Sequence, residues 1–154
     1  MNLKTLFLAG TLITGAAFAA FAHGDATGIV KERMHGMMAM SKALKSVGEM
    51  FKGKTKFNAQ GVEEAADIVL EHTANIEKLF PDTEASRNGK GTEAIPAIWE
   101  DRKGFLAIAT ELEKRATELK KIAASGDQDQ IRASFGIMAK SCGACHQDYR
   151  KKKE

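Results

Sequence analysis

Apolar side chains recur every three or four residues through two stretches in the N-terminal half of the chain, which is the period of one face of an α-helix. The first stretch runs from Thr27 to Lys52, and Gly53 follows it as a natural C-cap. The second begins at Asn58, a favoured N-cap residue, and stops at Pro81. The buried stripes of these predicted helices consist of Val30, Met34, Met37, Leu44, Val47 and Phe51, then Val62, Ala65, Ala66, Val69, Thr73, Ile76 and Phe80.

The C-terminal half shows the same period in two further stretches. A third helix is predicted from about residue 100 to residue 124, with Ser125 and Gly126 ending it. Asp127 is placed to cap a fourth helix. The buried side of this last helix includes Ile131, Phe135, Met138, Cys142, Cys145 and Tyr149.

Residues 82–98 follow no helical or strand period and contain several loop-forming residues. This connection is long for a helix bundle, and a loop of this length can bridge a helix or cover the edge of a cofactor. The chain contains no convincing strand pattern. Four amphipathic helices joined by two short connections and one long one predict an all-α fold, a four-helix bundle.

The segment from Met1 to Ala22 has the pattern of a secretory signal peptide. Lys4 supplies the early positive charge, an apolar core follows, and the small residues around Ala20 and Ala22 form a cleavage site. We expect cleavage after Ala22, although cleavage after Ala19 also fits. The apolar core is too short for a stable membrane anchor, and no later stretch is apolar enough to insert into a membrane. The mature domain would then be residues 23–154.

The motif Cys142-Gly143-Ala144-Cys145-His146 is the strongest chemical signal in the sequence. The spacing C-x-x-C-H is typical of a c-type haem attachment site. Two thiols three residues apart on a helix share one side and can reach two vinyl groups, and the imidazole of His146 shares that side. We therefore expect one covalently bound haem c, with Cys142 and Cys145 as its thioether residues and His146 as the proximal iron ligand. Such attachment takes place in an oxidising compartment, which in a bacterium is the periplasm.

Other interpretations of the two cysteines fit less well. A thioredoxin-like redox pair needs a βαβ setting, and no strand pattern precedes the motif. A zinc site would need further ligands, but the chain has only these two cysteines. A structural disulfide would close a very short, strained loop.

Charge gives little guidance to partners. The formal net charge is +3, and removing Lys4 with the signal peptide would leave +2. Nothing in this balance supports nucleic-acid binding. The one basic cluster runs from Arg150 to Lys153 and is countered by Glu154. We favour a solvated tail over a patch that steers an acidic redox partner.

The chain resembles the class II c-type cytochromes, the cytochrome c-prime and cytochrome c-556 family, on three features. These are the C-terminal haem motif extending to Arg150, Arg33 in the first helix, and the segment Pro96-Ala97-Ile98-Trp99. The resemblance implies an antiparallel four-helix bundle that encloses a covalent haem c. It also implies a homodimer built on the first two helices.

The family divides by what lies opposite the proximal histidine. Cytochromes c-prime usually have an apolar residue there and a five-coordinate iron that binds NO or CO, whereas the c-556 type uses a methionine of the first helix. By this resemblance Met37, one turn after Arg33, is the expected sixth ligand. Methionines at helical spacing can equally be core filler. Met34 would replace Met37 as the sixth ligand if the helix register shifts by one turn. His35 points about 100° away from Met34 around the helix axis.

Two arginines have roles implied by the same resemblance. Arg33 would lie near the distal haem face and pair with a propionate, unless it is an ordinary surface cation beside Lys31 and Glu32. Arg150, one turn beyond His146, would restrict access on the proximal side.

Together these features predict a periplasmic monohaem electron carrier with low-spin His/Met ligation, serving redox partners whose identity is not specified. The alternative is a five-coordinate cytochrome c-prime that binds NO or CO. An enzymatic role such as a peroxidase is not expected, because Arg33 and His35 are the only local polar candidates and do not face one iron together.

Overall fold

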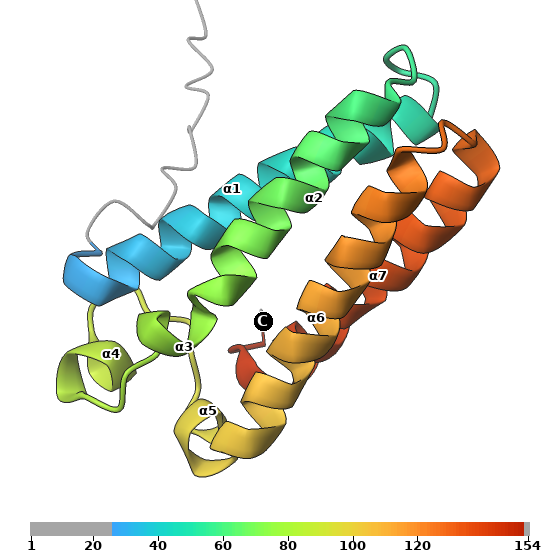
Figure 1. The fold of residues 1–154 in the computed structure, drawn as a ribbon. Helices are drawn as coiled ribbons and strands as arrows, with labels where there is room; N and C mark the ends of the chain where they lie inside the picture. The colour runs from blue at the N-terminus through green and yellow to red at the C-terminus, as the bar shows by residue number, and fades with distance from the viewer. Residues whose placement is uncertain (1–25, 153–154) are drawn as a thin grey trace, which may run out of the picture.

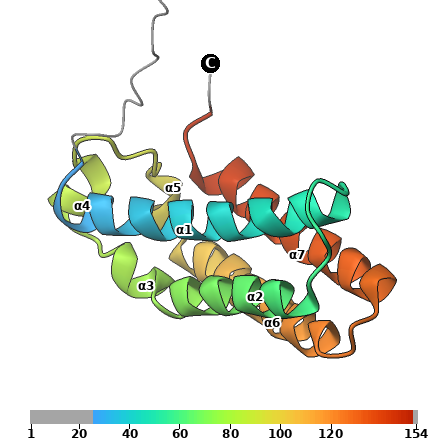
Figure 2. The ribbon, with the colours of Figure 1, turned by 90° about the horizontal axis from the view of Figure 1, so that it is seen from above.

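Four long helices form an antiparallel bundle in the computed structural model, which describes residues 26–152 (Figures 1 and 2). They are α1 (Gly28–Phe51), α2 (Ala59–Ala74), α6 (Arg102–Ala123) and α7 (Gln128–Tyr149). Packing is closest between α2 and α6 and between α6 and α7, followed by α1 and α2. The predicted all-α four-helix bundle is therefore confirmed. The predicted signal peptide, residues 1–22, lies outside the described residues.

The ends of the long helices follow from local capping chemistry. The Asn58 side chain accepts a hydrogen bond from the Gln60 N–H at 3.1 Å, and Asp127 accepts two, from Asp129 and Gln130, each at 3.0 Å. Gly53 and Gly126 take positive φ angles of 70° and 72° where α1 and α6 end, a conformation that glycine adopts without strain. The helix boundaries predicted at these four positions are confirmed.

The second predicted helix is interrupted near its end. α2 stops at Ala74 and the short helix α3 (Ile76–Leu79) continues after Asn75. The Thr73 hydroxyl donates to the carbonyls of Val69 and Leu70, at 2.9 and 3.1 Å. Such back-bonding competes with the helix ladder. The Asn75 N–H then donates to the His72 carbonyl, three residues back instead of four, at 3.3 Å. After the break, Ile76 and Phe80 are buried in one cluster with Ile98 and Phe105.

The long connection contains two short helices that the sequence period did not reveal, α4 (Glu84–Asn88) and α5 (Ala97–Glu100). The Trp99 indole ties this connection to the end of α3, because its Nε1–H donates to the carbonyls of Phe80 and Pro81. Ile98 is only 2% exposed, which confirms that the end of this connection is anchored in the core. Within residues 26–152 the only β-pairing is an isolated antiparallel bridge between Ala94 and Arg150.

The core divides into two clusters, which we call the packed half and the cavity half. The packed half lies where α1 ends and α7 begins, and its buried side chains are Met40, Val47, Val62, Ala65, Ala66, Val69, Leu112, Ala116, Leu119, Ala123, Ile131 and Met138. The cavity half lies at the other end, around Ile76, Phe80, Ile98, Phe105, Ala109 and Tyr149. No helix in the described part of the chain combines the length and apolar character needed to cross a membrane.

Candidate functional site

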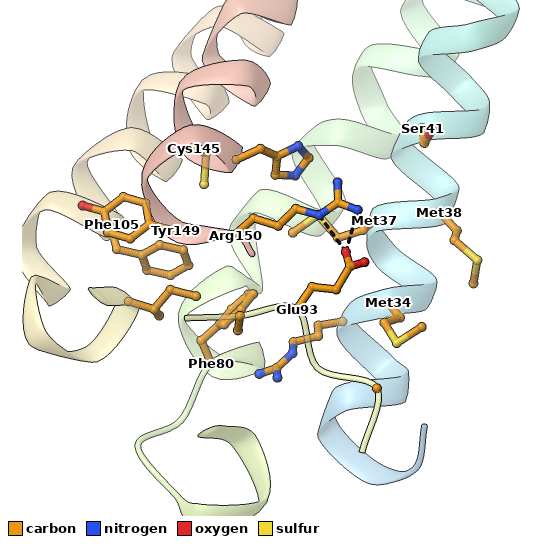
Figure 3. Close-up of a pocket in the computed structure, with 15 residues that line it drawn as sticks. Met34, Met37, Met38, Ser41, Phe80, Glu93, Phe105, Cys145, Tyr149 and Arg150 are labelled. Atoms are coloured by element: carbon orange, nitrogen blue, oxygen red, sulfur yellow. Dashed lines mark hydrogen bonds and ion pairs between the residues drawn. The ribbon is translucent and has the colours of Figure 1, made fainter. Parts of the chain in front are cut away.

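A cavity of about 290 Å³ opens between α1 and the C-terminal end of α7 (Figure 3). Met34, Met37, Met38 and Ser41 of α1 form one wall. The opposite wall consists of Cys145, His146, Tyr149 and Arg150, and the remaining lining includes Arg33, Phe80, Glu93, Ile98 and Phe105. The structure thus brings together the motif near the C-terminus and the first helix, as a haem-enclosing bundle requires.

The two cysteines are free, half-buried thiols on α7. Burial raises the pKa of Cys142, and burial together with Cys142 and Asp148 raises the pKa of Cys145 to about 11. A redox-active or nucleophilic cysteine has a lowered pKa instead, so the raised pKa of each thiol does not favour a thioredoxin-like pair. Among residues 26–152 no group of three or more His, Cys, Asp or Glu side chains is arranged to hold a metal ion.

His146 lies on the same face of α7 as Cys142, one turn away. Its pKa is lowered, first by partial burial and then by the charge of Arg150, while Glu93 acts in the opposite direction. A lowered pKa keeps the imidazole neutral at pH 7, and the neutral ring is the form that binds iron. Cys145 and His146 line the cavity, whereas Cys142, one turn before His146, packs against the side chains of the packed half. Haem attachment at the three residues stays a prediction.

Arg33 is buried at 4% exposure and is not the surface cation that its neighbours in sequence suggest. Its guanidinium donates to the Ser86 hydroxyl at 3.0 Å, the Ser86 carbonyl at 2.7 Å and the Thr92 hydroxyl at 2.6 Å, and it lies over the Phe80 ring. None of these partners in the described chain is a carboxylate, and burial lowers the pKa of the group. A buried cation with only neutral acceptors favours an anion beside it, such as a haem propionate.

Tyr149 forms the base of the α7 wall and contributes a bond that the sequence did not reveal. Its hydroxyl donates to the Asp101 carboxylate at 2.8 Å, and its ring packs edge-on against Phe105. Burial and the Asp101 charge raise its pKa to about 12. Gly104 leaves room for this bond, because a Cβ at this position would overlap the Asp101 carboxylate and the Tyr149 hydroxyl. The Tyr149–Asp101 bond fixes the end of α7 to the start of α6.

The other candidate site residues differ in whether they line the cavity. Met34 and Met37 line the cavity, so the predicted face of α1 is confirmed. His35 is exposed and does not line the cavity, in keeping with its predicted direction. Arg150 lines the cavity but is bound to Glu93, a residue that sequence reasoning did not select. Ser86, Thr92 and Glu93 all lie in the connection without helical period, which gave no signal for them.

Comparisons with known proteins show the family to which the chain belongs. The family model for cytochrome c′ matches residues 28–150. Cytochrome c′ of Rhodopseudomonas palustris is 30% identical over 156 residues, covering 99% of each chain, and its solved structure matches with a TM-score of 0.73 at 29% identity, covering 83% of this chain and 99% of that one. Cytochrome c-556 of Agrobacterium fabrum is 31% identical over 158 residues, again covering 99% of each chain.

A further solved structure bears on the ligand. It is a nitric oxide complex of a cytochrome c′ variant from Alcaligenes xylosoxidans, with a TM-score of 0.70 and 28% identity, covering 81% of this chain and 94% of that one. The matches confirm the prediction of one covalently attached haem c with its iron. The free thiols, the neutral imidazole and the buried Arg33 fit that group.

The predicted function, a low-spin electron carrier with Met37 as the sixth ligand, is wrong, whereas His146 as the proximal iron ligand stays a prediction. The matching family is cytochrome c′, whose members have a five-coordinate haem that binds NO or CO, and this favours the alternative function. The error has a physical cause. Helical spacing places Met37 on the cavity wall, but it does not decide whether the sulfur bonds to iron or packs. Met37 is half-buried and packs against both core clusters, as a flexible thioether readily does.

Proposed function

The chain belongs to the cytochrome c′ family, and from that premise we propose that it is a haem protein that binds nitric oxide or carbon monoxide. The observation that carries this proposal is the methionine-rich α1 wall opposite His146, which includes Met34 and Met37. Such a wall suits a small uncharged gas and disfavours anionic or strongly hydrated ligands. The nitric oxide complex of the Alcaligenes relative supports the same class of ligand here.

The two cysteines and the histidine of the α7 motif each have a defined part in this function. The thiols of Cys142 and Cys145 hold the haem as thioethers, and His146 binds the iron from the α7 side. The haem iron supplies an open coordination position when bound. Met37 stands on the opposite wall and limits the space available there. The packing of Phe105 against Phe80 and Tyr149 keeps the inner end of the cavity apolar, which excludes water.

Arg33 orients the haem by donating hydrogen bonds to a propionate at the distal side. Ser86 and Thr92 hold the guanidinium in place, so that little side-chain entropy remains to be lost when the anion arrives. An Arg33→Lys variant would keep the charge but lose the fork of donors, and it tests whether geometry or charge matters.

The side chains around the cavity favour binding over catalysis. A peroxidase needs polar groups aimed at the distal face of the iron. Arg33 is tied to Ser86 and Thr92, and His35 is exposed outside the cavity. We therefore assign no catalytic residue to this chain.

We also propose export to the periplasm through the signal peptide at residues 1–22, where an electron-donating partner keeps the iron reduced for CO binding. A homodimer through α1 and α2 stays a prediction. The half-exposed Met38 on α1 is one apolar side chain that such an interface would cover. Sedimentation of the mature protein over a concentration series would measure the oligomeric state.

The gas-binding proposal is tested by Met37→Ala, with Met50→Ala as a matched control. Met50 is also a partly buried methionine of α1, but it packs in the other half and does not line the cavity. Enlarging the cavity at position 37 should speed CO binding to the reduced protein at least several-fold, whereas the Met50 variant should bind at the wild-type rate. Equal rates for wild type and both variants would remove Met37 from the gas site. The measurement is stopped-flow absorbance after mixing with CO.

A further inference from the structure

Glu93 is a charged residue of the cavity that neither the motif nor the proposed gas site uses. It lies in the connection between α4 and α5, and its carboxylate binds the Arg150 guanidinium, with Nε–Oε2 at 2.6 Å and Nη2–Oε2 at 2.5 Å. Both side chains are only about one-third exposed, at 35% and 34%. An ion pair this short and this shielded is less screened by salt than an ordinary surface pair.

Backbone contacts hold the pair in position. The Lys151 N–H donates to the Glu93 carbonyl at 2.8 Å, and the Ile95 N–H donates to the Tyr149 carbonyl at 3.3 Å. These two bonds flank the bridge between Ala94 and Arg150. The residues directly after α7 are therefore pinned to the connection on both sides of position 150. Glu93 lies next to Ala94, the bridge partner of Arg150, so the paired backbone keeps the two charged side chains close together. A freely rotating surface pair would lack this constraint.

Both charges lie beside the proposed iron ligand. Arg150 follows His146 by four residues at the end of α7, and the ion pair holds Glu93 against Arg150. Arg150 and Glu93 also line the same cavity as His146 (Figure 3). A positive charge near the haem iron favours the ferrous state and a negative charge favours the ferric state. With Arg150 alone, the proximal side would carry an uncompensated positive charge.

We propose that Glu93 is a charge-compensating residue of the iron site: it cancels the Arg150 charge beside His146 and so sets the balance between the ferric and ferrous states. The inference rests on the proposed function, since it requires haem attached beside His146. It places one determinant of the reduction potential in the connection, outside the C-x-x-C-H motif. The consequence for function is direct, because CO binds only the ferrous form.

The test is an equilibrium redox titration of the purified haem-loaded protein and three variants, Glu93→Gln, Glu93→Asp and Glu84→Gln. Glu93→Gln keeps an oxygen that can accept from Arg150 but removes the charge. Glu93→Asp keeps the charge on a shorter side chain. Glu84→Gln makes the same charge change on α4, where Glu84 is exposed and accepts a bond from Asn88. Thermal unfolding of each variant reports any structural damage separately.

We expect Glu93→Gln to raise the ferrous-to-ferric ratio about threefold to tenfold at a fixed ambient potential, where tenfold corresponds to about 59 mV for one electron. Glu93→Asp and Glu84→Gln should each stay within about twofold of wild type. An unchanged potential in Glu93→Gln would overturn the proposal. Equal shifts of the reduction potential in Glu93→Gln and Glu93→Asp would mean that Glu93 has only a structural role, and this would contradict the proposal. An equal shift in Glu84→Gln would mean that any negative charge on the protein has the same effect, and this would contradict the proposal too.

This test is separate from that of gas binding. The titration needs no gas, so wild-type protein that fails to bind CO would contradict the proposed function while leaving the comparison of potentials intact. Conversely, protein that binds CO with a potential indifferent to Glu93 would contradict only the role of Glu93.

Discussion

The packed half and the cavity half of the bundle are built from the same four helices, yet they differ in what lies between α1 and α7. In the packed half these two helices meet directly. Phe51 of α1 packs edge-on against Phe135, and the Arg132 guanidinium donates to the Phe51 carbonyl at 3.0 Å. In the cavity half α1 presents methionines to an opening, and the α7 motif faces them across it. Side chains fill the space between α1 and α7 in the packed half. In the cavity half a bound group would fill it.

The difference teaches how a bundle separates stability from binding. In the packed half Val47, Val62 and Leu119 are fully buried, at 0% exposure, so this half supplies a dense apolar core without any ligand. The cavity half replaces such contacts with the connection between α3 and α6, which carries polar links to Arg33 and Arg150.

Replacing both thiols, as Cys142→Ala with Cys145→Ala, should abolish covalent haem attachment. Without the haem the cavity half lacks its filling group, so its amides should lose protection from hydrogen exchange, while amides of the packed half keep theirs. Mass spectrometry of the denatured protein measures the attached haem, and hydrogen exchange measures the protection. Uniform loss of protection along the whole chain would show that the two halves are not separable.

Leu119→Ala, in the packed half, should lower the free energy of unfolding by about 2–5 kcal/mol, because it leaves a cavity in a fully buried site. Urea denaturation provides the measurement. The rate of CO binding should stay at the wild-type value, since Leu119 does not line the cavity. A changed binding rate with this variant would mean that packing strain passes from one half to the other.

Tyr149→Phe tests the bond that closes the base of the cavity half. Losing the bond to Asp101 should cost about 1 kcal/mol of unfolding free energy at pH 7. The folded-state pKa of Tyr149 is raised from 10.0 to about 12, so the bond stabilises the fold fully below pH 10 and its contribution disappears as pH rises toward 12. The difference between wild type and variant, measured by urea denaturation from pH 8 to pH 12, should therefore shrink with rising pH. A constant difference would contradict the assigned bond.

Glu111→Gln should change the free energy of unfolding least, and it serves as a reference for the other variants. Glu111 pairs with Arg115 one turn along α6 at 2.6 Å, and both side chains are about 40% exposed. Such a pair contributes about 0.3–0.5 kcal/mol at low salt and less at high salt. A loss above about 1 kcal/mol in urea denaturation would show that surface pairs matter more here than we assume.

Local chemistry made much of this fold predictable. The caps at Asn58 and Asp127 and the glycines at 53 and 126 act within a few residues, so the sequence reveals them directly. The haem motif is equally local, because its spacing is dictated by one cofactor.

What the sequence could not reveal depends on contacts between distant segments. Arg33 looks like a surface cation among Lys31 and Glu32 until the connection brings Ser86 and Thr92, 53 and 59 residues away, onto its guanidinium. Glu93 meets Arg150 across 57 residues, through a backbone bridge without any strand period. Met37 is intermediate: its place on the cavity wall follows from helical spacing, but spacing does not decide between packing and a bond to iron.

The central claim is that the iron keeps an open position opposite His146, and optical spectroscopy of the wild-type protein tests it most directly. Spectra would be recorded for the oxidised protein, for the dithionite-reduced protein, and for the reduced protein after CO is added. The account predicts high-spin spectra in both oxidation states and ready formation of a CO complex on reduction. Low-spin spectra that do not respond to CO would contradict it.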